Sequence, residues 1–113
     1  MGDFDTIGVQ PFRVTSRSDG ARTVVEAHGE LDLATVPAVE GEVQELRARG
    51  ARRIVLDLRE VTFMDSSGLS LLLRLDGEAR ANGFSFAIVE GEGPVRRLLE
   101  LTDLADGFQH EEL

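Results

Sequence analysis

The chain has 113 residues and 42% apolar content, enough for one compact domain with a single core, and this length argues against a second domain. Its 21 acidic residues outnumber the 12 basic ones, and the net charge of -9 repels phosphate backbones and anionic lipids, so we expect no nucleic acid and no membrane partner. Cysteine is absent, which excludes disulfides, thiolate catalysis and Cys-ligated metals.

The two ends of the chain carry no recognisable structural pattern. We expect a flexible leader over residues 1–11, one domain over residues 12–110 and a tail over residues 111–113. The acidic start has neither the basic region nor the apolar core of a signal peptide, and the longest apolar run, residues 69–75, is interrupted by Ser70 and Arg74. These features predict a soluble, cytoplasmic protein.

The first half of the chain predicts a hairpin and a helix. Apolar and polar residues alternate over 12–17, an extended pattern resumes over 23–28, and Asp19-Gly20 between them supplies turn chemistry. A helix is expected next, ending before Gly50, because apolar residues recur there at helical intervals. These apolar positions are Val36, Val39, Val43 and Leu46.

The second half predicts two further strands and two further helices. Residues 54–58 are nearly all apolar, typical of a central strand covered on both faces, and residues 84–89 form another strand. Helices are expected over 66–82, closed by Gly83, and from Pro94 onward. Their expected core positions are Leu69, Leu72, Leu73 and Leu75, then Leu98, Leu99 and Leu101. The result is a small mixed α/β fold of order β-β-α-β-α-β-α, with room for a short terminal strand at Phe108.

The most informative segment is residues 63–69 (Phe-Met-Asp-Ser-Ser-Gly-Leu), where a buried strand passes into a helix and Ser66 or Ser67 meets the helix start. One interpretation is a structural N-cap, which contributes about 1 kcal/mol. The other is a phosphorylation site, because one hydroxyl is enough for the cap. The end of a central strand is also where α/β folds place functional groups.

Other chemistry at this segment is less well supported. A serine hydrolase would need Gly-x-Ser-x-Gly, and the first glycine is missing; His28 and His110 are the only candidate bases. Asp32 either stabilises the helix start that follows it or lines the same rim as Asp65. Two carboxylates without further ligands do not make a metal site, so we expect no metal and no cofactor.

Three segments together resemble the anti-sigma factor antagonists, single STAS domains of bacterial partner-switching systems. They are residues 29–32 (Gly-Glu-Leu-Asp), residues 54–58 running into 63–69, and residues 95–101 (Val-Arg-Arg-Leu-Leu-Glu-Leu). The similarity covers about residues 12–110 and implies a STAS-type sheet with helices and a regulatory protein rather than an enzyme.

The resemblance also implies a mechanism and a set of partners. Unmodified antagonist binds an anti-sigma factor that is also a serine kinase, and a sigma factor is freed. Phosphorylation of Ser66 ends the binding and a serine phosphatase restores it, while ATP belongs to the kinase. The partner-binding residues expected on this basis are Asp32, Asp65, Ser66, Ser67, Gly68 and Ser70.

Two positions depart from the family pattern. Ser70 stands where relatives commonly have Gly, and Asp103 replaces the Gly usual after the last matched helix. Because the family also uses this fold in other ways, the alternative is a ligand-binding or scaffold STAS module that serves a transporter or a stress-sensing complex.

Overall fold

The computed structural model describes residues 11–113, so the expected leader lies outside the described residues except for its last position. The elements follow the chain as β1 (Arg13–Asp19), β2 (Arg22–Leu31), α1 (Val36–Ala48), β3 (Arg53–Met64), α2 (Ser66–Asn82), β4 (Ser85–Val89), α3 (Pro94–Leu101), the 3-10 turn η2 (Ala105–Gly107) and β5 (Gln109–His110). This order confirms the α/β class and the predicted succession of elements, the short terminal strand included.

The strands form one sheet in the order β1-β2-β3-β4-β5. The hairpin of β1 and β2 is antiparallel and turns at Gly20, whose φ of 66° suits glycine, while the remaining strand pairs are parallel. β3 is central, as predicted, but it is longer than the apolar run at 54–58 and continues to Met64. A single residue, Asp65, therefore separates the end of β3 from the start of α2.

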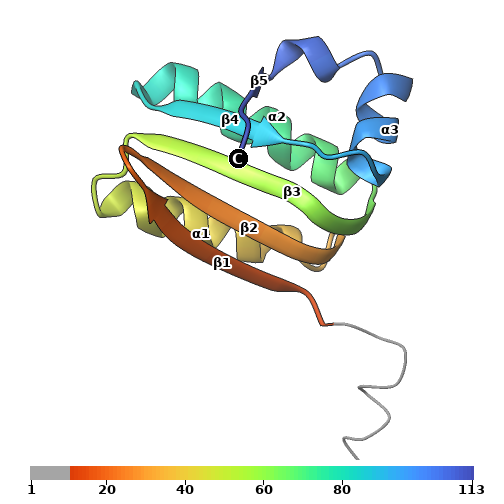
Figure 1. Cartoon of the computed structure of the whole chain (residues 1–113), viewed down its shortest axis with the longest axis horizontal. Helices are drawn as coiled ribbons and strands as arrows, with labels where there is room; N and C mark the ends of the chain where they lie inside the picture. The colour runs from red at the N-terminus through yellow and green to blue at the C-terminus, as the bar shows by residue number, and fades with distance from the viewer. Residues whose placement is uncertain (1–10) are drawn as a thin grey trace, which may run out of the picture.

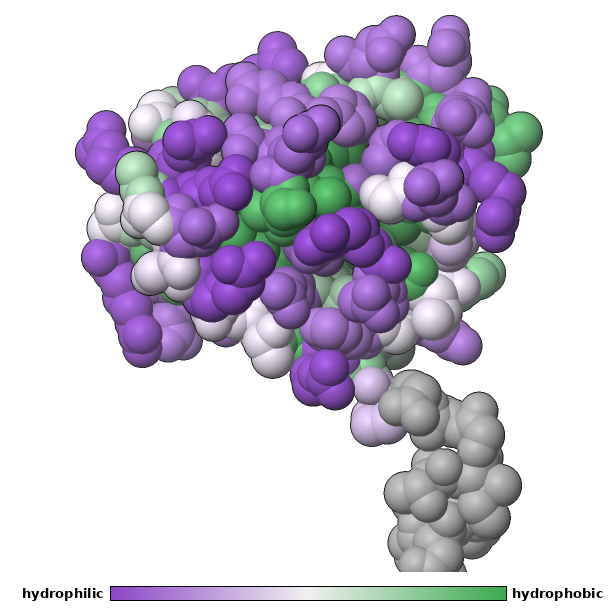
Figure 2. Space-filling model, viewed as in Figure 1, coloured by the Kyte–Doolittle hydropathy of each residue, from purple (hydrophilic) through white to green (hydrophobic). Residues whose placement is uncertain are grey.

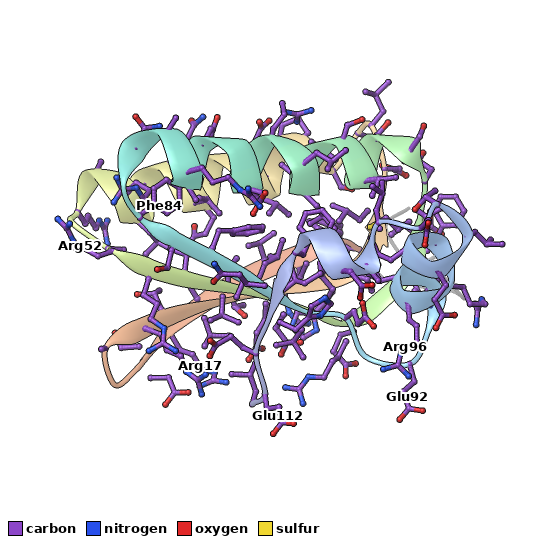
Figure 3. The ribbon with its side chains drawn as sticks, turned by 90° about the horizontal axis from the view of Figure 1, so that it is seen from above. Arg17, Arg52, Phe84, Glu92, Arg96 and Glu112 are labelled. Carbon is purple, nitrogen blue, oxygen red and sulfur yellow. The ribbon has the colours of Figure 1, made fainter. Side chains whose placement is uncertain are left out.

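The main core lies between the sheet and the helices α1 and α2, which cover the same face (Figures 1 and 3). Two leucines expected in this core are exposed instead: Leu73 keeps 47% of its surface and Leu101 keeps 84%. Each lies two residues from a buried leucine, Leu75 or Leu99, and a step of two residues turns a helix by about 200°. Leu71 takes the core position that was assigned to Leu73.

The opposite face of the sheet is covered by charged side chains rather than by helices. Val24, Val55 and Ala87 lie in register across three strands of this face and are buried, although they are separate from the main core. Figure 2 shows hydrophilic side chains around a small apolar centre here, and Figure 3 places Arg17 and Glu112 on this side. β3 is thus covered on both faces, as predicted, with ion pairs over one of them.

The last residues take part in this charged layer. The carboxylate of Glu111 accepts hydrogen bonds from Arg53, at 3.0 Å, and from Arg22, and the Glu111 amide donates to the carbonyl of Ile88 at 3.0 Å. The two arginines lower the pKa of Glu111. These hydrogen bonds therefore attach the residue that follows β5 to β2, β3 and β4.

Asp57 is the buried charged residue of this layer, and its carboxylate is paired with Arg59 on the same strand. The guanidinium donates to it twice, at 3.0 and 2.9 Å, and the Arg59 amide donates at 3.1 Å. Burial opposes ionisation of Asp57, but these hydrogen bonds prevail and leave its pKa lowered. A side chain on Gly91 (φ 71°) would press on Arg59, so the loop after β4 lies close against this residue.

We predict that acid removes the stabilisation from this pair. Because the folded pKa of Asp57 lies below its ordinary value of 3.8, the contribution is complete above that pH and is lost as the pH falls through the folded pKa. Urea unfolding between about pH 5 and pH 2 should show a steeper loss of unfolding free energy for the wild type than for Asp57→Asn. Parallel curves would contradict the assignment.

Gly77 within α2 and Gly83, which caps the end of this helix, should respond in opposite directions to alanine. A methyl group on Gly77 or on Gly83 would meet nothing within 4 Å, but Gly83 has a φ of 72°. Gly77→Ala should raise the unfolding free energy by about 1 kcal/mol through helix propensity, whereas Gly83→Ala should lower it by about 1 kcal/mol. Thermal denaturation of the two variants tests both signs, and an equal shift in both would be inconsistent with this backbone account.

Candidate functional site

The site is built where β3 ends and α2 begins. Asp65 stands between them with extended backbone (φ -110°, ψ -168°), and its Oδ1 accepts hydrogen bonds from the amides of Ser67, at 2.9 Å, and Gly68, at 3.4 Å. The interpretation of a serine as the N-cap is therefore wrong, because Asp65 is the N-cap. Aspartate caps a helix as well as serine does, and Asp65 occupies the last extended position.

Both serines consequently have free hydroxyls. Ser66 is exposed at the first helical position and Ser67 is half-buried. Within residues 11–113, neither hydroxyl forms a hydrogen bond to the protein. Ser66 is the more accessible of the two nucleophiles, on a backbone that Asp65 holds in place.

Gly68 sets the distance between α2 and the strand ends. It is buried, and a Cβ atom at this position would lie 2.4 Å from Cγ of Met64 and 3.2 Å from the carbonyl oxygen of Leu31. Only glycine lets the first turn of the helix approach β2 and β3 this closely. Of the expected partner-binding residues, Gly68 is thus turned inward, and its role here is to seat the helix.

Asp32 lies on the same rim as Asp65. Leu31 and Met64 are paired in the parallel register, and the two aspartates are the residues that follow them. The Oδ1 atom of Asp32 accepts hydrogen bonds from the amides of Ala34, at 3.0 Å, and Thr35, at 3.2 Å. Asp32 therefore also orders the turn that leads into α1, and both roles proposed for it are compatible.

Of the remaining candidate residues, Ser70 lies near this rim and the two histidines do not. Ser70 is exposed, one helical turn beyond Ser66. His28 lies in β2, 3.4 Å from Glu26, and a ring nitrogen of His110 is 2.8 Å from the carbonyl of Ala105, so the structure engages both histidines elsewhere. In the part of the chain that is described, no three acidic or histidine side chains group as a metal site, and no helix is long and apolar enough to cross a membrane.

Asp103 occupies a left-handed backbone position with a φ of 60°, the one such non-glycine residue in the described range. Such a position favours glycine, and aspartate tolerates it less well than glycine but better than most residues. Sequence reasoning did not identify three apolar residues near the site as exposed: Leu33, Phe63 and Leu73. The spacing of Leu73 from Ser66, seven residues or two turns, was the available signal.

We predict that the cap and the hydroxyls differ in their effect on stability. Asp65→Ala removes the acceptor for two helix amides and should lower the unfolding free energy by about 0.5–2 kcal/mol. Ser66→Ala and Ser67→Ala remove no hydrogen bond and should each change it by less than about 0.5 kcal/mol. Chemical denaturation of the three variants makes the comparison, and a loss for Ser66→Ala as large as for Asp65→Ala would refute this assignment of the cap.

The chain is similar to known proteins over most of its length. A family model described as Mlab, STAS domain, matches residues 14–110. The chain is 35% identical over 82 residues to the anti-sigma-B factor antagonist of Staphylococcus aureus (strain NCTC 8325 / PS 47), a match that covers 73% of this chain and 76% of that protein.

Solved structures show the same architecture. An anti-sigma factor antagonist from Mycobacterium paratuberculosis aligns with a TM-score of 0.75 and 29% identity over 91% of this chain and 87% of that one. The phosphorylated form of SpoIIAA, a Bacillus cell fate determinant, shares the fold at 21% identity with a TM-score of 0.64, over 90% and 92% of the two chains. The chain belongs to the STAS domain family, among the anti-sigma factor antagonists.

Proposed function

We propose that the protein binds an anti-sigma factor that is also a serine kinase, and that phosphorylation of Ser66 by this kinase ends the binding. A sigma factor is released while the unmodified protein holds its partner, and a serine phosphatase restores the unmodified state. In this cycle the chain is a protein substrate rather than an enzyme, and the kinase holds the ATP. The exchange takes place in the cytoplasm, where sigma factors act.

The observation that carries the proposal is the exposed and unbonded hydroxyl of Ser66. Its neighbours have structural tasks, because Asp65 caps α2 and Gly68 packs against Met64. Ser66 has no such task in the fold. A hydroxyl fixed at a rim and accessible from outside is what a kinase active site requires of its substrate. Two similar proteins support parts of this cycle: one is named an anti-sigma-B factor antagonist, and the other, SpoIIAA, has been solved in a phosphorylated form.

Electrostatics explains how a phosphate would act here. Phosphorylation adds a charge of about -1.5 to -2 at neutral pH. The helix start attracts this charge by about 0.3–1 kcal/mol, but Asp65 already accepts the nearest amides and, with Asp32, repels it. The opposing contributions are similar in size, so the fold should tolerate the modification. A buried, unpaired phosphate in a docked complex, in contrast, costs several kcal/mol.

The alternative, a ligand-binding or scaffold module, has one observation in its favour. A shallow groove runs between the carboxyl-terminal parts of α1 and α2, far along α2 from Ser66, lined by Val43, Gln44, Arg47, Glu78, Asn82 and Phe84. Its cation is already engaged, since the Arg47 guanidinium lies 4.0 Å from the Phe84 ring centroid and donates to the Ala51 carbonyl at 2.6 Å. The groove therefore offers a ligand little free charge, and the switch is the better supported function.

The phosphorylation site is tested by mass mapping. The protein is incubated with ATP and the anti-sigma factor kinase that co-purifies with it, then digested and analysed. We expect one phosphate, on Ser66, with Ser67→Ala modified as readily as the wild type and Ser66→Ala not modified. Phosphate on another residue, or none despite a stable complex, would rule out the proposal.

The binding consequence is tested with charge-mimicking variants. Ser66→Ala should bind the kinase as tightly as the unmodified protein, whereas Ser66→Asp should bind about 10- to 100-fold more weakly, equivalent to about 1.4–2.8 kcal/mol. Ala81→Asp is the matched control, because the same charge is placed on an exposed position of α2 that lies 15 residues from Ser66. Calorimetric titration gives the affinities, and equal values for Ser66→Ala and Ser66→Asp would reject the electrostatic mechanism.

A further inference from the structure

An apolar side chain occupies the middle of the solvent face of α2. Leu73 keeps 47% of its surface exposed, and the buried residues of the helix lie on its other side. At 3.6 residues per turn, Ser66, Ser70 and Leu73 fall within an arc of about 60°. The core does not use Leu73, so the fold gives no reason for a leucine rather than a polar residue at this position.

A second exposed leucine lies close to the start of α2. Leu33, 78% exposed, follows Asp32 in the connection between β2 and α1. Figure 1 shows this connection and the start of α2 at the same end of the molecule, where β2 and β3 finish. The hydrogen bond from the Ala34 amide to Asp32 fixes the backbone around Leu33. Both leucines are thus presented on ordered backbone beside Ser66.

The size of a protein interface decides what can cover these leucines. A stable interface buries about 800 Å² on each partner, which corresponds to a patch of about 16 Å radius. Leu73 is seven residues along the helix from Ser66, and a rise of 1.5 Å per residue puts it about 10 Å away. An interface of this size centred on Ser66 therefore also covers Leu73, and the loop with Leu33 borders the same patch because Leu31 pairs with Met64 in the sheet.

We propose that Leu33 and Leu73 are the apolar anchors of the surface on which the Ser66 kinase docks. This inference rests on the proposed function and extends it, because it assigns affinity for the kinase to residues other than the phosphoacceptor. The kinase is the occupant that the geometry favours, since its active site must be centred on Ser66. Burying a leucine contributes enough to change an affinity about 10- to 100-fold.

The test introduces a glutamate at each of the two leucines and, as a control, at a distant position of α2. Leu73→Glu and Leu33→Glu should each raise the KM of the kinase for the protein about 10- to 100-fold with kcat unchanged, and Leu73→Met should restore the wild-type KM. Ala81→Glu is the matched control. Ala81 is exposed and lies on the same side of α2, but 15 residues and about 22 Å from Ser66, beyond the patch.

The outcomes separate this inference from the proposed function. If the wild type is not phosphorylated on Ser66, the proposed function fails. If it is, and Leu73→Glu and Leu33→Glu keep the wild-type KM or change it no more than Ala81→Glu, only the docking surface is refuted. If instead the higher KM follows dissociation of a dimer, seen by analytical ultracentrifugation at the assay concentration, the leucines belong to an interface with a second copy and the inference is overturned.

Discussion

The close packing of Gly68 against Met64 and the carbonyl of Leu31 fixes the start of α2 at the ends of two parallel strands. Asp65 holds the same junction from the other side, because its carboxylate accepts hydrogen bonds from two amides of the first helical turn. With the backbone held on both sides in this way, the first of the two serines between them, Ser66, faces solvent. The chemistry proposed for this protein therefore depends on a junction in which the reactive hydroxyl makes no bond of its own.

This arrangement separates stability from signalling. The stability of the domain comes from the core beneath α1 and α2 and from the ion pairs over the other face of the sheet, such as Asp57 with Arg59. Neither includes Ser66. A charge added there changes the free energy of a complex much more than that of the fold, because only the complex removes the charge from water. A switch built this way can be turned over many times without unfolding the protein.

Much of this could be predicted from the sequence, because each element has its own apolar spacing and the junction at 63–69 is short. Three features could not. Asp65 and Ser66 are equally good caps by type, and only the backbone shows which residue is extended. Leu71 and Leu73 are both apolar, and a small error in helical phase exchanged core for surface. The pairing of Arg22 with Glu111 joins residues 89 positions apart, which no local pattern reveals.

The most direct measurement compares unmodified protein with protein fully phosphorylated on Ser66, recording for each its melting temperature and its affinity for the anti-sigma factor. The account predicts that phosphorylation weakens binding by about 100-fold or more, equivalent to about 2.8 kcal/mol, while the melting temperature moves by no more than about 2 °C. Unchanged affinity, or weaker binding that accompanies a large loss of thermal stability, would contradict it.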